Sequence, residues 1–343
     1  MERQNPELFG SFAGADFLKT VPPIDKIAVT EGPGLEPTLW VGINFARMLA
    51  ALWNVPIIPV DHMEGHILGS LLPSDATNGV WQRLHEAPMP AIALLISGGH
   101  TELVKVSKLG DYEILGRTKD DAVGEAFDKA ARLLGLPYPG GPHLAELSHK
   151  AWEEKIPSPV KLPRPMQKSG DLDFSFSGLK TAVLYAVRDA AIQKATVDLS
   201  ASPNDSHTNQ TEVTHDENSP DFKAAIKPPS TTDHFELTDD FKKGLAYEFE
   251  QAVAETLDGK LSMAIERIGA KSIIVGGGVS ANHFLRQRFE KTAAEYGIPL
   301  FLPSRHISGD NALMIAVAGA LHHSDAKTPR HDIRAHGTKH LGA

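Results

Sequence analysis

The fold class is decided by residues 26–72, KIAVTEGPGLEPTLWVGINFARMLAALWNVPIIPVDHMEGHILGSLL. Residues 26–30 form a short apolar run that is typical of a buried strand, and the following Gly-Pro-Gly predicts a turn. Apolar residues at helical spacing predict a helix from about Pro37 to Trp53, with Pro37 suited to its first turn. A second strand at 56–60 and a helix at 62–72 complete the stretch. This strand–helix–strand–helix order predicts α/β architecture.

The rest of the chain continues the mixture of strands and helices. Two predicted strands flank SGGH at residues 97–100, which is a hairpin-turn signal. A buried strand at 272–275 runs into three glycines and then a helix from about Ser280. The other elements that apolar periodicity predicts are strands at 91–96, 101–106 and 112–116 and helices at 123–134, 179–191, 242–268 and 311–321.

Composition is that of an ordinary globular enzyme. The 343 residues are 41% hydrophobic and 22% charged, a length and balance that favour two domains. No apolar run approaches the roughly 20 residues of a membrane span, so we expect no membrane association. The absence of cysteine fits a cytoplasmic location. There is no cysteine, so a transition metal would have to be held by His, Asp and Glu. The net charge of −9 argues against broad electrostatic binding of nucleic acid but allows a local basic patch.

One long segment does not fit a packed core. Residues 196–235 are rich in Ser, Thr, Asn, Asp and Pro and contain almost no aromatic residues. Such a stretch cannot bury enough apolar surface to offset the entropy lost on ordering. We therefore predict a disordered insertion there, whose deletion would leave folding nearly unchanged.

The sequence DHMEGH, residues 61–66, is the first candidate for chemistry. His62 and His66 are four residues apart, so on a helix both imidazoles lie on one face and can share a metal. The alternative is a pair of histidines at a helix surface or end. In a zincin peptidase a glutamate directly follows the first histidine, but here Met63 stands there and Glu64 comes one residue later.

A catalytic metal needs a third ligand, and Asp310 in SGDN at residues 308–311 is the candidate. The alternative is that Asp310 caps the following helix by accepting backbone hydrogen bonds. Two histidines and one carboxylate would form an open facial site suited to Fe²⁺, with Zn²⁺ also possible.

We expect three glycine-rich turns, at 97–99, 140–141 and 276–278. Glycine lets backbone N–H groups approach a phosphate or an adenine closely, although any single such turn can be only a turn. Asp128 lies off the buried stripe of its predicted helix. It could pair with Arg132 or bond a ribose hydroxyl, and the spacing does not choose between them.

Nine segments in order resemble one protein family, the TsaD family. They are TEGPG (30–34), DHMEGH (61–66), LISGGHT (95–101), DDAVGEAFDK (120–129), PYPGGP (137–142), PRPM (163–166), DFSFSGLKT (173–181), VGGGVSAN (275–282) and DNALMIA (310–316). The resemblance covers about residues 24–321 and is interrupted by the insertion.

The resemblance implies an actin-like, sugar-kinase-like fold of two related α/β lobes with a nucleotide between them. It also implies an activity: transfer of a threonylcarbamoyl group from threonylcarbamoyl-AMP to N6 of the adenosine 3′ to the anticodon, in tRNAs that read ANN codons. By the same resemblance, TsaB-like and TsaE-like proteins are expected partners.

Carried onto this chain, His62, His66 and Asp310 resemble the metal ligands of the family, and no catalytic residue is assigned beyond them. The expected contacts to the adenylate are Leu95, Ile96, Ser97, Gly98, Gly99, Asp128, Gly141 and Asn282. We expect the turns at 98–99 and 276–278 to face each other across an interlobe cleft, with Asn282 and Asp128 nearby.

The resemblance also sets the expected domain ranges. They are an irregular N-terminus at 1–23, a partial first lobe at 24–90, a second lobe at 91–321 whose last helix packs back toward the first lobe, and a polar tail at 322–343. Family members usually begin with a strand carrying GIETSCDET, followed by a hairpin and a helix, and nothing like it precedes Ile24. We therefore expect an incomplete first lobe, weak adenylate binding and impaired transfer.

Two other functions remain open at this stage. HxxxH also suggests a metallopeptidase, against which Met63 counts. The third hypothesis is a scaffold that binds adenylate without transferring an acyl group.

Overall fold

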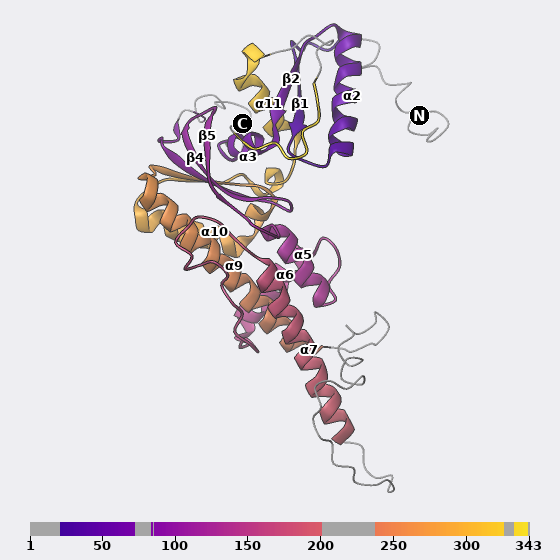
Figure 1. The fold of residues 1–343 in the computed structure, drawn as a ribbon, viewed down its shortest axis with the longest axis vertical. Helices are drawn as coiled ribbons and strands as arrows, with labels where there is room; N and C mark the ends of the chain where they lie inside the picture. The colour runs from indigo at the N-terminus through magenta and orange to yellow at the C-terminus, as the bar shows by residue number, and fades with distance from the viewer. Residues whose placement is uncertain (1–20, 73–83, 85, 201–236, 326–332, 342–343) are drawn as a thin grey trace, which may run out of the picture. The chain divides into compact units, whose positions relative to one another are not determined.

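The computed structural model describes residues 21–72, 84, 86–200, 237–325 and 333–341 (Figure 1). They form two compact units. The first comprises the described parts of 1–125, 164–176 and 253–343, and the second those of 126–163 and 177–252. The expected lobe ranges, 24–90 and 91–321, do not coincide with these units. None of the described helices is long and apolar enough to cross a membrane.

The first unit begins with the β–α–β arrangement that residues 26–72 predict. Strands β1 (Ile27–Gly32) and β2 (Ile57–Asp61) pair in parallel, and α2 (Glu36–Trp53) connects them. Parallel strands require such a crossover. Helix α2 buries Leu39 and Ile43 against this pair of strands, and helix α3 (His62–Ser70) follows β2 directly.

A five-stranded sheet of order β5-β4-β3-β6-β7 forms the rest of the β structure in this unit. The hairpin prediction is confirmed, because β3 and β4 are antiparallel around residues 97–100, while β6 pairs in parallel with β3 on its other side. The strand bounds are β3 (Ala91–Ile96), β4 (Thr101–Lys108), β5 (Asp111–Arg117), β6 (Ser272–Gly276) and β7 (Leu300–Phe301).

The last α-helix of the described residues, α11 (Ala312–Leu321), packs between α3 and the β1–β2 pair (Figure 1). The approach to β1 is close: a Cβ at Gly319 would lie 2.5 Å from the Ala28 Cβ. The core between these elements includes Val60, Ile67 and Leu95, all almost fully buried.

The predicted polar tail at 322–343 includes a segment that contacts the first unit. Its described residues, 333–341, lie along β1, where the His336 N–H donates to the Glu31 carbonyl (2.8 Å) and the Gly34 N–H to the Gly337 carbonyl (3.2 Å). Ile333 is buried against α2. These contacts make residues 333–341 part of the first unit.

The second unit is helical over its described residues. It contains most of α5 (Val123–Leu133), all of α6 (Gly140–Glu154) and α7 (Ser177–Ser200), and the first part of α9 (Asp239–Ile268). Helix α6 was not predicted. The predicted insertion starts too early, because residues 196–200 are helical in α7, and the remainder of 196–235 lies outside the described residues.

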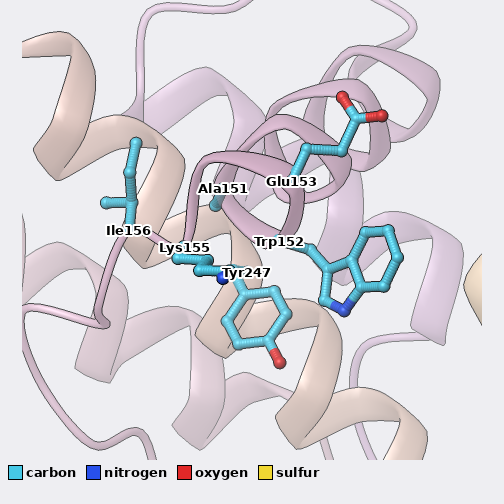
Figure 2. Close-up of a pocket in the computed structure, with 6 residues that line it drawn as sticks. All are labelled: Ala151, Trp152, Glu153, Lys155, Ile156 and Tyr247. Atoms are coloured by element: carbon cyan, nitrogen blue, oxygen red, sulfur yellow. The ribbon is translucent and has the colours of Figure 1, made fainter.

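A pocket of about 610 Å³ lies on the second unit (Figure 2). The residues that line it are Ala151, Trp152, Glu153, Lys155, Ile156 and Tyr247. None of the residues that the sequence singles out for metal or adenylate binding is among them.

Candidate active site

The two predicted metal-ligating histidines lie on α3. The Asp61 side chain caps this helix by accepting hydrogen bonds from the backbone N–H groups of Met63 (2.8 Å) and Glu64 (3.3 Å). The cap satisfies two of the N–H groups that a helix start leaves without partners. His62 and His66 stand one turn apart with their ring centroids at 4.8 Å. Both imidazoles therefore share one face of α3, as the spacing predicts.

Asp310 joins the histidines and does not cap a helix. The cap of α11 is the next residue, Asn311, whose side-chain oxygen accepts from the Met314 N–H at 3.0 Å. The Asp310 Oδ1 lies 3.3 Å from the His62 Nε2 and 3.2 Å from the His66 Nε2. Contacts with His62 and then His66 hold the pKa of Asp310 well below its usual range. The expected convergence of the three side chains is confirmed, and the capping alternative is wrong.

The three side chains fit a divalent metal. One nitrogen from each histidine and one carboxylate oxygen all lie within 4.8 Å of one another. Ligands held at about 2.0–2.2 Å from one ion lie about 3 Å apart when they meet at right angles, which matches both nitrogen–oxygen distances. The His66 Nε2 is buried, and although it lies 3.2 Å from the Asp310 Oδ1 it forms no well-oriented hydrogen bond among the described residues. A metal ion would give that buried atom a partner.

Two glycines on α3 let α11 approach closely, and this places Asp310 next to the two histidines. A Cβ at Gly65 would lie 3.0 Å from the Ile315 Cδ1, and one at Gly69 would lie 3.1 Å from the Met314 Cβ. Both glycines are on the face of α3 that meets α11, four residues apart. Larger residues there would push away the helix that Asp310 precedes.

Glu64 lies between the two histidines in sequence but is engaged elsewhere. Its carboxylate is buried, accepts a hydrogen bond from the Tyr112 hydroxyl (2.8 Å) and pairs with the His322 Nε2 (2.8 Å). Burial, and next the charge of Glu64, raises the pKa of Tyr112. Because this carboxylate ties α3 to β5 and to the end of α11, it is not placed to activate a metal-bound water. Glu64 is therefore not placed to be the general base that the peptidase hypothesis requires.

The turn after β3 offers backbone and not apolar side chains to a ligand. Leu95 and Ile96 are fully buried in the sheet, so of these two only the main chain can face a substrate. The Ser97 side chain closes the turn by accepting from the N–H of His100 at 3.0 Å. Gly98 and Gly99 are exposed, and nothing lies within 4 Å of a Cβ built on either of them.

The turn after β6 lies beside the β3 turn and not opposite it. Strands β3 and β6 are parallel neighbours with Leu95 paired to Gly276, so both turns leave the same edge of one sheet. A Cβ at Gly277 would lie 2.4 Å from the Ile96 carbonyl oxygen. The expectation that the two turns face each other across a cleft is therefore wrong. Ligands of open α/β sheets commonly bind at the carboxyl ends of the strands, where both turns lie.

Asn282 has a structural contact of its own. It follows the short 3-10 helix η2 (Gly278–Ala281) and caps α10 (His283–Tyr296), since its side-chain oxygen accepts from the Leu285 N–H at 3.0 Å. If Asn282 also binds the adenylate, its side chain must do so while its oxygen caps α10.

Asp128 and Gly141 belong to the second unit, where they contact each other. The Asp128 Oδ1 accepts from the N–H groups of Gly140 (2.8 Å) and Gly141 (3.2 Å) at the start of α6. The residue at the helix-cap position, Pro139, forms no side-chain cap, so Asp128 supplies it from α5. The hydrogen bonds to α6 account for the position of the Asp128 carboxylate without an ion pair to Arg132 or a contact with a ribose.

We expect Asp128→Ala to lower the free energy of unfolding by about 1–2 kcal/mol, the usual cost of a lost helix cap. Asp128→Asn keeps an acceptor oxygen and should lose less than half as much. Urea unfolding of both variants measures the difference. Wild-type stability of Asp128→Ala would contradict the capping role, and weaker adenylate binding by a stable Asp128→Asn is the result that a ribose contact requires.

Two groups near the three candidate metal ligands were not predicted from the sequence. His100 is half-buried, and its pKa is lowered by burial and then by the nearby His62 and His66. The Lys339 Nζ lies 2.6 Å from the Glu31 Oε1 and 3.9 Å from the Asp61 Oδ2, next to the start of α3. His100 could have been found from its place in the SGGH turn. No motif around Lys339 predicts that it lies near the start of α3.

Comparison with known proteins identifies the family of this chain. The family model of TsaD, described as tRNA N6-adenosine threonylcarbamoyltransferase, matches residues 18–317. A curated relative of that name from Aromatoleum aromaticum is 40% identical over 298 residues, which are 87% of this chain and 70% of the relative. One from Methylobacillus flagellatus is 40% identical over 313 residues, or 91% of this chain and 76% of the relative. Among solved structures, HypF of T. kodakarensis aligns with a TM-score of 0.43 and 13% identity, over 94% of this chain and 44% of that one. The extent of the family match and the identity to these relatives show that this chain belongs to the TsaD family.

Proposed function

We propose that this chain transfers the threonylcarbamoyl group from threonylcarbamoyl-AMP to N6 of the adenosine 3′ to the anticodon in tRNAs reading ANN codons. The observation that carries the proposal is the convergence of His62, His66 and Asp310 in a member of the TsaD family. The N6 nitrogen forms a bond to the carbamoyl carbon, the bond from that carbon to the phosphate oxygen breaks, AMP leaves, and the amine loses a proton.

His62, His66 and Asp310 would hold one divalent ion, which supplies Lewis-acid polarisation and a fixed template when it is bound. Two imidazoles and one carboxylate leave coordination positions open, a donor set that suits Fe²⁺ best and also accepts Zn²⁺. The protein's remaining task is to orient a weak amine against the acyl carbon, and such positioning accounts for a large share of many rate enhancements.

The adenylate is proposed to lie at the sheet edge formed by the turns at 97–99 and 276–278. There Gly98 and Gly99 expose backbone without a Cβ, and Leu95 and Ile96 would contribute main chain only. Ser97, Asn282, Asp128 and Gly141 complete the proposed contacts. For the last three, a binding role would be added to the capping contacts described above.

We further propose that TsaB-like and TsaE-like proteins are partners in the cytoplasm. One surface supports this. Helix α2 exposes apolar side chains at Val41, Phe45, Met48 and Leu52, spaced four, three and four residues apart along one face. Exposed apolar faces of this kind commonly mark protein–protein interfaces.

The test supplies threonylcarbamoyl-AMP made with labelled threonine, tRNA that reads an ANN codon, and the purified chain with its partner proteins. We expect label on the tRNA. We expect none when guanosine replaces the adenosine 3′ to the anticodon. Cleavage of casein that disappears in His62→Ala, without labelling of tRNA, would favour the peptidase instead.

A further inference from the structure

Two exposed basic side chains, Arg305 and His306, lie on the 3-10 helix η3 (Arg305–Ile307), which leads to Asp310. Their position matters because the chain carries a net charge of −9. A polyanion such as tRNA is repelled by that overall charge and needs a local basic surface.

The loop that bears these side chains is held in place relative to Asp310. The Ser308 hydroxyl donates to the Arg305 carbonyl at 2.9 Å. The Asn311 side-chain amide donates to the carbonyls of Ile307 (3.0 Å) and Gly309 (2.9 Å) while its oxygen caps α11. Arg305 and His306 are thus fixed at a short distance along the chain from a metal ligand.

Arg286 holds the start of the same loop through a hydrogen bond to Pro303. Its Nε donates to the Ser280 carbonyl at 2.6 Å, and another nitrogen of its guanidinium donates to the Pro303 carbonyl. These bonds join the loop to the turn that follows β6. Burial lowers the pKa of Arg286, and the nearby charge of Arg305 lowers it further. Two arginines are therefore close together, and Arg305 forms no ion pair with any residue in the described ranges.

We propose that Arg305 and His306 bind the phosphate backbone of the tRNA next to the adenosine that is modified, and that Arg286 is the residue that positions their loop. An anion there would offset the repulsion between the two guanidinium groups. Cationic side chains that contact phosphate oxygens fix the register of a protein on a nucleic acid. The inference rests on the proposed function, because that function makes tRNA the substrate.

The variants are Arg305→Ala, Arg305→Glu and Arg305→Lys. Lys291→Ala serves as a control, because Lys291 is also an exposed cation of this unit but pairs with Glu295 at 3.6 Å on α10. Unmodified tRNA transcript is titrated at several salt concentrations. We expect Arg305→Ala to weaken binding about 3- to 10-fold and to reduce the slope of log affinity against log salt by about one. Arg305→Glu should be weaker still, Arg305→Lys should restore most of the affinity, and Lys291→Ala should match the wild type.

Transfer kinetics separate tRNA from the small substrate. The KM for tRNA should rise in Arg305→Ala, while kcat and the KM for threonylcarbamoyl-AMP stay unchanged. Wild-type tRNA affinity and salt slope in both Arg305→Ala and Arg305→Glu would overturn the inference. So would a raised KM for threonylcarbamoyl-AMP with unchanged tRNA binding, since the phosphate recognised would then be the adenylate's. A wild-type chain that binds tRNA with the expected salt slope but transfers nothing would refute the proposed function alone.

Discussion

Asp310→Ala is expected to reduce threonylcarbamoyl transfer by about 100-fold or more and to lower the bound metal to a small fraction of the wild-type content. Asp310 supplies the carboxylate that meets both histidines, with nitrogen–oxygen distances of 3.2 and 3.3 Å. A catalytic metal contributes several kcal/mol of charge stabilisation, and each 1.36 kcal/mol changes a rate about tenfold. Transfer is measured with labelled threonine, and metal content by elemental analysis.

The stability of this variant should stay close to that of the wild type. The Asp310 side chain is 75% exposed and Asn311 caps α11, so the substitution removes no helix cap and leaves no cavity. His149→Ala and Asp189→Ala are matched controls, since both residues are exposed and lie in the second unit. Full transfer activity with a normal metal content in Asp310→Ala would show that these three side chains do not hold the metal.

Gly277→Ala should destabilise the protein by about 2–4 kcal/mol, through backbone strain and overpacking together. Gly277 has φ of +92°, and its added Cβ would lie 2.4 Å from the carbonyl oxygen of Ile96. A backbone oxygen within a paired strand cannot move aside as the end of a flexible side chain can. Chemical denaturation measures the loss.

The adjacent glycine provides the matched control for this substitution. Gly278 has no atom within 4 Å of a built Cβ and does not have a positive φ. Gly278→Ala should therefore change the unfolding free energy by less than about 0.5 kcal/mol. Equal stability of the two variants would mean that the β3 and β6 turns are not packed as described.

Much of the local structure follows from the sequence because it depends on local periodicity. Residues 26–72 predict β1, α2, β2 and α3 to within a few residues, since buried faces repeat with the periods of strand and helix. The four-residue spacing likewise places His62 and His66 on one face of α3. The SGDN segment made Asp310 a candidate for either a third ligand or a helix cap, and the family resemblance favoured the ligand.

What the sequence did not predict depends on contacts between distant segments. Asp310 and Asn311 are adjacent, so the sequence alone does not show which of them caps α11. In the structure Asn311 forms the cap, and Asp310 contacts the two histidines instead. Asp128 caps α6 from a different helix, so no local pattern reveals it. The β3 and β6 turns are about 180 residues apart in sequence, and their adjacency follows from strand order, which periodicity does not specify.

The most direct test of the central claim, acyl transfer at the His62–His66–Asp310 site, is the formation of threonylcarbamoyladenosine in tRNA, detected by mass spectrometry of its nucleosides. The protein is first stripped of metal with a chelator and then supplied with Fe²⁺ or Zn²⁺, together with threonylcarbamoyl-AMP and the partner proteins. We predict no modified nucleoside from the stripped protein, recovery with at least one of the two ions, and no recovery in Asp310→Ala. Equal modification by the stripped protein, or recovery of Asp310→Ala by the same ion, would contradict it.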